Sequence, residues 1–247
     1  MSTDPAAIRL DQRLVSLGLA ETRTRAQALI SAGVVTVDGA VRRKAADRVT
    51  GTVEITRNPC PWVSRAALKL VHALDAFDLT PTGIAADIGA STGGFTEVLM
   101  ARGASEVHAV DVGHGQIHPR IAALPGVRVH EGINARDLPD GVLPPLDWIV
   151  CDVSFISLTK ALPPVLAHAN PGAHLVALIK PQFEAGPGRV GKGGIVSDPE
   201  IHERVRAQIV EFLTEAGWRT LGEIESPITG GDGNREFLIA ARRLTQE

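Results

Sequence analysis

From residue 64 onward the sequence alternates between strand-like and helix-like runs, and this alternation constrains the fold more than any other feature. The strand-like runs cover 84–88, 106–111, 127–130, 148–152 and 174–179. The helix-like runs cover 64–77, 95–101, 157–168 and 199–216. Such a succession favours a doubly wound α/β domain, in which a parallel sheet carries helices on both faces. Two more strand-like runs follow, at 220–226 and 236–240.

A smaller segment precedes this region. Its apolar residues predict a short helix closed near Gly18 and a second helix capped by Thr22. Two β-prone runs then flank Asp38-Gly39, which is a strong hairpin signal, and a last strand is expected at 52–56. Proline-rich residues 59–63 are typical of a linker. The sequence therefore predicts a small α+β domain at 1–58 and a larger α/β domain at 64–247.

Charge is divided unevenly between these parts. Residues 1–65 carry 10 Lys and Arg against 6 Asp and Glu, a net charge of +4, whereas residues 66–247 carry 15 against 22, a net charge of −7. A basic N-terminal segment before an acidic domain suggests that a polyanion binds the N-terminal segment, although chance clustering of charges is an alternative. The basic residues that we expect to bind RNA phosphates are Arg9, Arg13, Arg23, Arg25, Arg42, Arg43, Lys44, Arg65 and Lys192.

Composition narrows the class of protein further. No apolar run approaches the roughly 18 residues of a membrane span, and residues 1–7 lack the basic and apolar stretches of a secretory signal. Cys60 and Cys151 show no metal-ligand spacing, so neither a disulfide framework nor a zinc site is expected. A cytoplasmic protein with no metal and no membrane partner fits these features best.

A glycine-rich loop follows the first strand of the predicted sheet, and the next strand ends in an acid, Asp111. Ligands of doubly wound sheets bind at the carboxyl ends of strands, where glycines allow close approach and a carboxylate can bind ribose hydroxyls. The dinucleotide fingerprint G-x-G-x-x-G is absent, and a mere tight turn is the alternative. The predicted cofactor-binding residues are Asp87, Gly89, Ala90, Ser91, Thr92, Gly93, Gly94, Phe95 and Asp111.

A second glycine-rich stretch, 186–193, nearly matches a phosphate-binding P-loop. Gly193 stands where that motif has its magnesium-binding Ser or Thr, and no helix pattern follows directly. We interpret this stretch as a mobile basic loop beside the active site, in which Lys192 either touches RNA phosphate or is solvated.

Four stretches carry a family resemblance: Arg9-Leu10-Asp11 with Thr24-Arg25-Ala26, Trp62-Val63-Ser64-Arg65, the loop 87–95 as D-x-G-x-x-x-G-G, and Cys151-Asp152-Val153-Ser154-Phe155-Ile156-Ser157-Leu158. On these residues the larger domain resembles the FtsJ-like ribose 2′-O-methyltransferases. Nearly the whole chain resembles the TlyA family of rRNA methyltransferases, which also bears the name haemolysin, and the first segment resembles the alpha-L RNA-binding domain. The resemblance implies a Rossmann-like sheet, S-adenosylmethionine (SAM) as cofactor, and methyl transfer to a ribose 2′-hydroxyl of ribosomal RNA or subunits, of cytidine by the family pattern.

The resemblance also implies a catalytic Lys-Asp-Lys-Glu set, which falls on Lys69, Asp152, Lys180 and Glu236. Asp152 and Lys180 end predicted strands at the ligand-binding edge, and Lys69 lies opposite the apolar stripe of its helix. A sulfonium methyl needs only alignment with the hydroxyl and removal of one proton. We expect Lys180 to be the general base, beside Lys69 as the neighbouring cation, with both carboxylates orienting the amines. Two ordinary surface ion pairs are the alternative.

Asn134 and Ala135 would, by the same resemblance, lie near the adenine, with an ordinary turn as the alternative. One position departs from the family pattern, because Cys60 stands where actinobacterial members often have the arginine of an R-x-W-V linker.

Two other functions remain open. One is a membrane-damaging haemolysin, although no long basic amphipathic helix is present. The other is an RNA-binding protein whose methyltransferase domain is inactive. For an enzyme of this kind, specificity would come from RNA shape.

Overall fold

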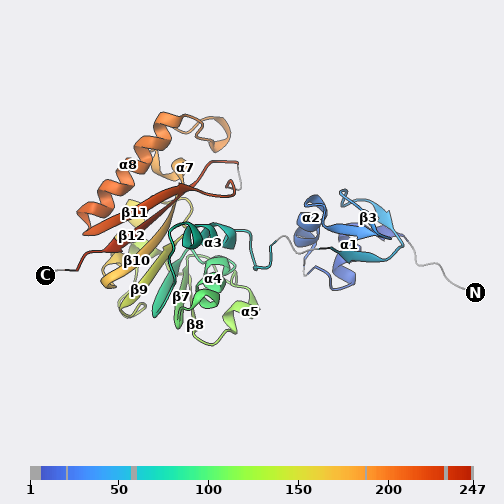
Figure 1. The fold of residues 1–247 in the computed structure, drawn as a ribbon, viewed down its shortest axis with the longest axis horizontal. Helices are drawn as coiled ribbons and strands as arrows, with labels where there is room; N and C mark the ends of the chain where they lie inside the picture. Colours follow the sequence, from blue (N-terminus) through green and yellow to red (C-terminus); the bar gives the residue numbers. More distant parts are fainter. Residues whose placement is uncertain (1–6, 21, 57–59, 187, 231–232, 246–247) are drawn as a thin grey trace, which may run out of the picture. The chain divides into compact units, whose positions relative to one another are not determined.

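The chain divides into two compact units, Met1–Pro61 and Trp62–Glu247 (Figure 1). The computed structural model describes residues 7–245 apart from residues 21, 57–59, 187 and 231–232. The predicted boundary between residues 58 and 59 lies outside the described residues, so the domain limits 1–58 and 64–247 stay predictions. Within the described ranges, no helix is both long enough and apolar enough to cross a membrane.

The smaller unit packs two helices against short strands. Its elements are β1 (Ile8–Arg9), α1 (Leu10–Ser16), α2 (Arg23–Ser31), β2 (Val35–Val37), β3 (Ala40–Val41), β4 (Arg48–Val49) and β5 (Val53–Ile55). As expected, the Thr22 hydroxyl caps α2 by accepting a hydrogen bond from the backbone N–H of Arg25 at 3.2 Å. Asp38 and Gly39 both have positive φ, 51° and 77°, and they join β2 to β3 in the expected hairpin.

The larger unit is built on a sheet with the strand order β11-β12-β10-β9-β6-β7-β8. Its strands are β6 (Ile84–Ile88), β7 (Glu106–Asp111), β8 (Val127–Glu131), β9 (Leu146–Cys151), β10 (Ala169–Ile179), β11 (Trp218–Glu225) and β12 (Phe237–Arg243). The five strands from β6 to β10 run parallel, which confirms the doubly wound α/β class. The two last strands differ, because β12 lies antiparallel between β10 and β11.

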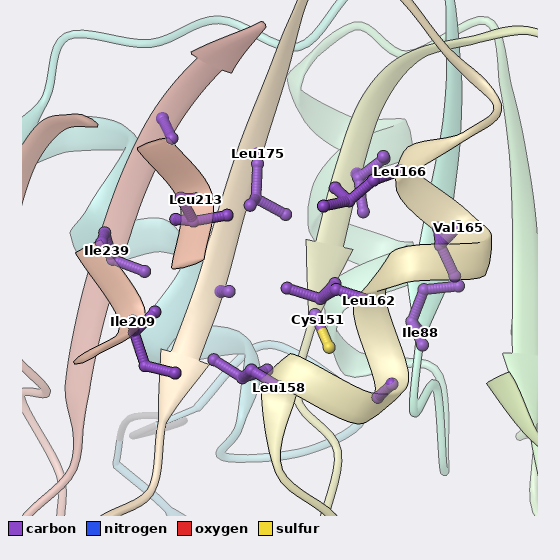
Figure 2. Packing of buried hydrophobic residues seen from close by; sticks show 14 of the residues in the cluster. Ile88, Cys151, Leu158, Leu162, Val165, Leu166, Leu175, Ile209, Leu213 and Ile239 are labelled. Carbon is purple, nitrogen blue, oxygen red and sulfur yellow. The ribbon is translucent and has the colours of Figure 1, made fainter. Parts of the chain in front are cut away.

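Helices cover both faces of this sheet, as the alternating pattern predicts. The helices are α3 (Ala67–Ala76), α4 (Gly94–Arg102), α5 (Pro119–Ala122), α6 (Leu158–Leu166), α7 (Pro181–Glu184) and α8 (Pro199–Glu215), with short 3₁₀ turns η1 (Ala135–Asp137) and η2 (Lys192–Gly194). Buried residues of α3 and α4 pack on one face. Those of α6 and α8 pack on the other, where Leu158, Leu162, Ile209 and Leu213 meet strand residues such as Leu175 (Figure 2). Each such buried side chain contributes about 1.5–3 kcal/mol to stability.

Candidate active site

The glycine-rich loop joins β6 to α4 at the carboxyl edge of the sheet. Gly89 has φ of 82°, and a Cβ there would lie 2.7 Å from the carbonyl oxygen of Asp152. Gly93 has φ of 92°, and a Cβ there would lie 2.8 Å from Cγ2 of Ile121. These two positions require glycine because backbone conformation and close packing both exclude a side chain. The loop therefore keeps its backbone pressed against the end of β9.

A pocket of about 290 Å³ opens beside this loop, and we call it the glycine-loop pocket. Five of the predicted cofactor residues line it: Gly89, Ser91, Asp111, Asn134 and Ala135. The other six do not: Asp87, Ala90, Thr92, Gly93, Gly94 and Phe95. Phe95, for example, points into the core formed with α3. The prediction missed apolar lining residues that follow β8 and β9, among them Ile133, Val153 and Ile156. The strand-end rule that indicated Asp111 would have found them.

Asp111 is held firmly at the end of β7. One of its carboxylate oxygens accepts a hydrogen bond from the backbone N–H of Ser91 and the other accepts one from Gly113, each at 2.7 Å. These bonds tie the glycine loop to the neighbouring strand end. The carboxylate thus stands in the pocket lining in one fixed orientation.

Asp87 is a buried carboxylate just before the glycine loop. The Thr96 hydroxyl donates a hydrogen bond of 2.6 Å to one oxygen, whereas the other oxygen has no hydrogen-bond partner among the described residues. Burial raises the pKa of Asp87 to about 7, because a charged carboxylate is poorly solvated there. The Thr96 bond and nearby backbone lower the pKa only partly, while the negative charges of Asp152 and Asp111 raise it further.

The four predicted catalytic residues come together from four separate elements. The ammonium nitrogen of Lys69 lies 2.6 Å from a carboxylate oxygen of Glu236, and that of Lys180 lies 2.6 Å from Asp152. Asp152 also approaches Lys69, at 3.7 Å, so its carboxylate links the two pairs. The Lys180 ammonium donates a further hydrogen bond of 2.9 Å to the hydroxyl of Ser154, a contact that the sequence analysis missed.

Burial distinguishes these pairs from surface ion pairs. The side chains of Lys69, Lys180 and Glu236 are 8%, 9% and 3% exposed. The sequence pattern sets Lys69 opposite the apolar stripe of its helix, and the neighbouring residues Arg65 and His72 are exposed. Lys69 differs because Glu236, immediately before β12, pairs with it and covers it. An amphipathic pattern cannot separate a face that meets solvent from one that meets a polar site.

A second pocket, of about 420 Å³, opens onto these residues, and we call it the lysine pocket. Lys69, Lys180 and Glu236 line it, together with the predicted RNA contact Arg65. Ser154 lines both this pocket and the glycine-loop pocket, so the two are neighbours. Across the residues with a described position, no group of three or more His, Cys, Asp or Glu is arranged to hold a metal ion.

The other predicted RNA-binding residues occupy differing surroundings. Arg9 and Arg23 pair with buried Asp11 at 3.0 and 3.1 Å, and Arg25 donates a hydrogen bond to the carbonyl oxygen of Cys60. Arg42, Arg43 and Lys44 are exposed, whereas Arg13 is half-buried. The side chain of Lys192 lies outside the described part of the chain. The exposed group 42–44 is thus the most available to a polyanion.

Comparison with known proteins follows the same division of the chain. Residues 62–243 match the model of the FtsJ-like methyltransferases, and residues 8–55 match the S4 domain. The 16S/23S rRNA (cytidine-2′-O)-methyltransferase TlyA of Mycobacterium tuberculosis is 44% identical, over 96% of this chain and 90% of that protein. Hemolysin A of Brachyspira hyodysenteriae is 39% identical, over 94% of this chain and 98% of its own length.

A solved structure agrees with the sequence relatives. It is that of a hemolysin-named protein from Streptococcus thermophilus, which is 37% identical, with a TM-score of 0.76 over 98% of this chain and 90% of the other. The family match covers the glycine loop and all four residues of the buried Lys-Asp-Lys-Glu cluster. The chain therefore belongs to the FtsJ-like methyltransferase family, together with TlyA, and carries an S4 domain before its methyltransferase domain.

Proposed function

We propose that this enzyme transfers a methyl group from SAM to a ribose 2′-hydroxyl of ribosomal RNA, on cytidine. The observation that carries the proposal is the buried Lys69–Glu236 and Lys180–Asp152 cluster, which opens on the lysine pocket directly beside the glycine-loop pocket. The name of the M. tuberculosis relative, a cytidine-2′-O-methyltransferase of rRNA, supports the same reaction.

The glycine-loop pocket suits SAM. Asp111 offers a fixed carboxylate for two ribose hydroxyls, while Asn134, Ala135 and apolar Ile133 would surround the adenine. The unpartnered oxygen of buried Asp87 adds negative potential behind the loop, which favours a cationic ligand. When bound, SAM supplies a methyl group on a sulfonium ion, already activated for attack by an oxygen.

The chain's own task is then to orient the hydroxyl and to accept its proton. Lys180 is the proposed base, and its nitrogen would take the proton in its neutral form. Ser154 and Asp152 hold that nitrogen from two sides, at 2.9 and 2.6 Å, and thereby aim it at the lysine pocket. Lys69, held by Glu236, supplies a second positive charge beside the site. No metal takes part in this scheme.

The S4 domain would deliver the RNA. Its exposed Arg42, Arg43 and Lys44 favour phosphate contacts, which are insensitive to sequence and so suit recognition by shape. On the methyltransferase unit, Arg65 at the lysine pocket would contact the RNA strand close to the target ribose.

Labelled methyl transfer tests the function and the role of Lys180 together. Purified ribosomal subunits and naked rRNA are incubated with [methyl-³H]SAM and the full chain, and the label is mapped by nuclease digestion. Lys180→Arg keeps the positive charge but removes the base, because arginine stays protonated. Single-turnover rates should fall about 10²–10⁴-fold, while the SAM dissociation constant measured by calorimetry changes little.

Arg204→Lys, a matched exchange at an exposed site on α8, is the control and should behave as wild type. Absence of label in rRNA with the wild-type chain would refute the function. Near-normal turnover by Lys180→Arg would refute only its role as base, and would leave Lys180 as a positioning residue.

A further inference from the structure

Phe155 is the most conspicuous side chain that the proposed reaction leaves unexplained. It is 90% exposed, the largest exposure among the described large apolar residues. Its φ of 66° lies in the left-handed region, which is strained for a bulky residue. A strained backbone that presents a large aromatic ring to solvent, three residues after Asp152, is typical of a functional site.

Phe155 forms one wall of a third hollow, of about 560 Å³, which we call the aromatic pocket. The Phe155 and Phe183 rings pack with their centroids 5.0 Å apart and form an apolar wall. Arg136 and Lys160, both exposed, bring two positive charges to the lining. Among the described residues that line the hollow, none is Asp or Glu. Arg136 makes a long, exposed ion pair with Asp137, at 3.5 Å. In an acidic domain, an aromatic surface lined by two cations is still a local exception.

The aromatic pocket adjoins both other pockets. It shares Asn134 with the glycine-loop pocket, Gln182 and Phe183 with the lysine pocket, and Ser154 and Phe155 with both. If the target ribose occupies the lysine pocket, an RNA strand that continues from it has this hollow as an immediate neighbour. A nucleotide offers a flat base and an anionic phosphate, which match an aromatic wall and two cations.

The wall is also held rigid before any ligand arrives. The carboxylate of Glu184 accepts hydrogen bonds from the Ser157 hydroxyl at 2.5 Å and from the backbone N–H of Leu158 at 2.8 Å. These bonds join the segment after β9, which carries Phe155, to the segment after β10, which carries Phe183. Preorganisation of this kind lowers the entropy cost of binding.

We propose that the aromatic pocket binds the nucleotide adjacent to the methylated one, with its base stacked on Phe155 and Phe183 and its phosphate contacted by Lys160 and Arg136. This proposal rests on the proposed function. It adds a second RNA subsite on the methyltransferase unit, apart from the S4 domain and from the catalytic lysines.

Two substitutions separate the two kinds of contact. Phe155→Ala removes the stacking surface, and Lys160→Glu reverses a charge. Arg204→Glu, the same reversal on exposed α8, is the control. Each full-length variant is assayed for binding of a fluorescein-labelled single-stranded oligoribonucleotide, for methyl transfer to naked rRNA and to ribosomal subunits, and for SAM affinity. We expect Phe155→Ala and Lys160→Glu each to weaken oligonucleotide binding and raise KM for rRNA about tenfold. Lys160 lines neither of the other two pockets, so Lys160→Glu should also keep SAM affinity and kcat within about twofold of wild type.

The oligonucleotide-binding assay distinguishes failure of this proposal from failure of the proposed function, because binding needs no methyl transfer. If both variants bind RNA and turn over like Arg204→Glu, the subsite does not exist, even though the methyltransferase assignment stands. Defects on ribosomal subunits but not on naked rRNA or the oligonucleotide would mean that a ribosomal protein occupies the pocket, which also overturns the proposal. An oligonucleotide in which one residue lacks its base should bind wild type more weakly than its intact parent, and this difference should vanish in Phe155→Ala.

Discussion

Two fully buried aspartates have pKa values shifted in opposite directions, because their immediate surroundings differ. Hydrogen bonds from Arg9, Gln27 and Arg23 hold the pKa of Asp11 well below its usual range, although burial opposes this shift. Burial dominates at Asp87, whose only side-chain donor among the described residues is Thr96, and raises its pKa to about 7. Asp11 therefore orders Arg9 and Arg23 of the S4 domain, whereas Asp87 stores an unfavourable negative charge next to the glycine loop once it ionises.

Asp87→Asn should stabilise the protein in a pH-dependent way. The raised folded-state pKa means that the unfolded chain ionises near pH 4 while the folded chain stays protonated until about pH 7. Wild-type stability is therefore lost as pH rises through this window, and the neutral variant avoids that loss. At pH 8 the variant's free energy of unfolding should be higher by on the order of 4 kcal/mol, as measured by urea denaturation.

This gain in unfolding free energy should shrink steadily as pH falls toward 4, and equal gains at pH 5 and pH 8 would contradict the prediction. SAM affinity provides the complementary readout. Because the stored negative charge favours a cationic ligand, calorimetry should show weaker SAM binding by Asp87→Asn at pH 8. Stability would then rise while cofactor binding falls.

Among the elements, the ends of β9 and β10 are joined by one half-buried carboxylate. Glu184 of α7 bonds to the Ser157 hydroxyl and to the N–H of Leu158 at the start of α6, and burial raises the pKa of Glu184. Ser157 is also the N-cap of α6, since its hydroxyl accepts from the N–H of Thr159 at 3.2 Å. One hydroxyl thus stabilises both the helix start and the connection between two catalytic strand ends.

Ser157→Ala should cost about 1–2 kcal/mol of unfolding free energy, through loss of the cap and of one donor to the half-buried Glu184 carboxylate. In urea denaturation this appears as a lower midpoint with an unchanged slope. Ser197→Ala, at an exposed position just before α8, is the matched control and should shift stability by less than about 0.5 kcal/mol. Equal midpoints for the two variants would show that the Glu184 connection carries no stability.

For the whole molecule, the division into two units predicts that cofactor binding and RNA docking can be separated. Deleting residues 1–58 should leave SAM affinity intact, because the glycine-loop pocket lies wholly within the larger unit. Methylation of ribosomal subunits should be lost. If Arg42, Arg43 and Lys44 each contact a phosphate, a fourfold rise in salt lowers full-length RNA affinity roughly 40-fold through these contacts alone.

Filter binding at 50 and 200 mM salt measures this dependence. Replacing all three residues by Ala should reduce the logarithmic salt slope by about three. Salt-independent binding would contradict docking through phosphates, and full activity of the truncated chain would show that the S4 domain is not needed for delivery.

Local sequence patterns were sufficient to predict much of the fold of this protein. Alternation of strand and helix periods predicted the parallel strands β6 to β10, and Asp38-Gly39 predicted the hairpin, because both depend on interactions among residues close in sequence. Strand-end position indicated Asp111 by the same logic, and it agreed with the family resemblance that singled out Asp152 and Lys180. The shortest elements were not predicted. β1, β4, α5 and α7 span only two to four residues, too few to show a hydrophobic periodicity.

Tertiary structure alone decided how distant segments meet. The sequence carried strand signals for β11 and β12 but no sign that β12 enters antiparallel between β10 and β11, since pairing partners are set by the packing of the whole sheet. That insertion brings Glu236 onto Lys69, 167 positions earlier in the chain, and so buries a lysine that helical periodicity had set opposite the apolar stripe. The aromatic pocket arises in the same way, because Phe155 and Phe183 follow different strands and become neighbours only when β9 and β10 pair. Periodicity reports which side of an element is apolar, whereas long-range pairing determines what a polar side finally contacts.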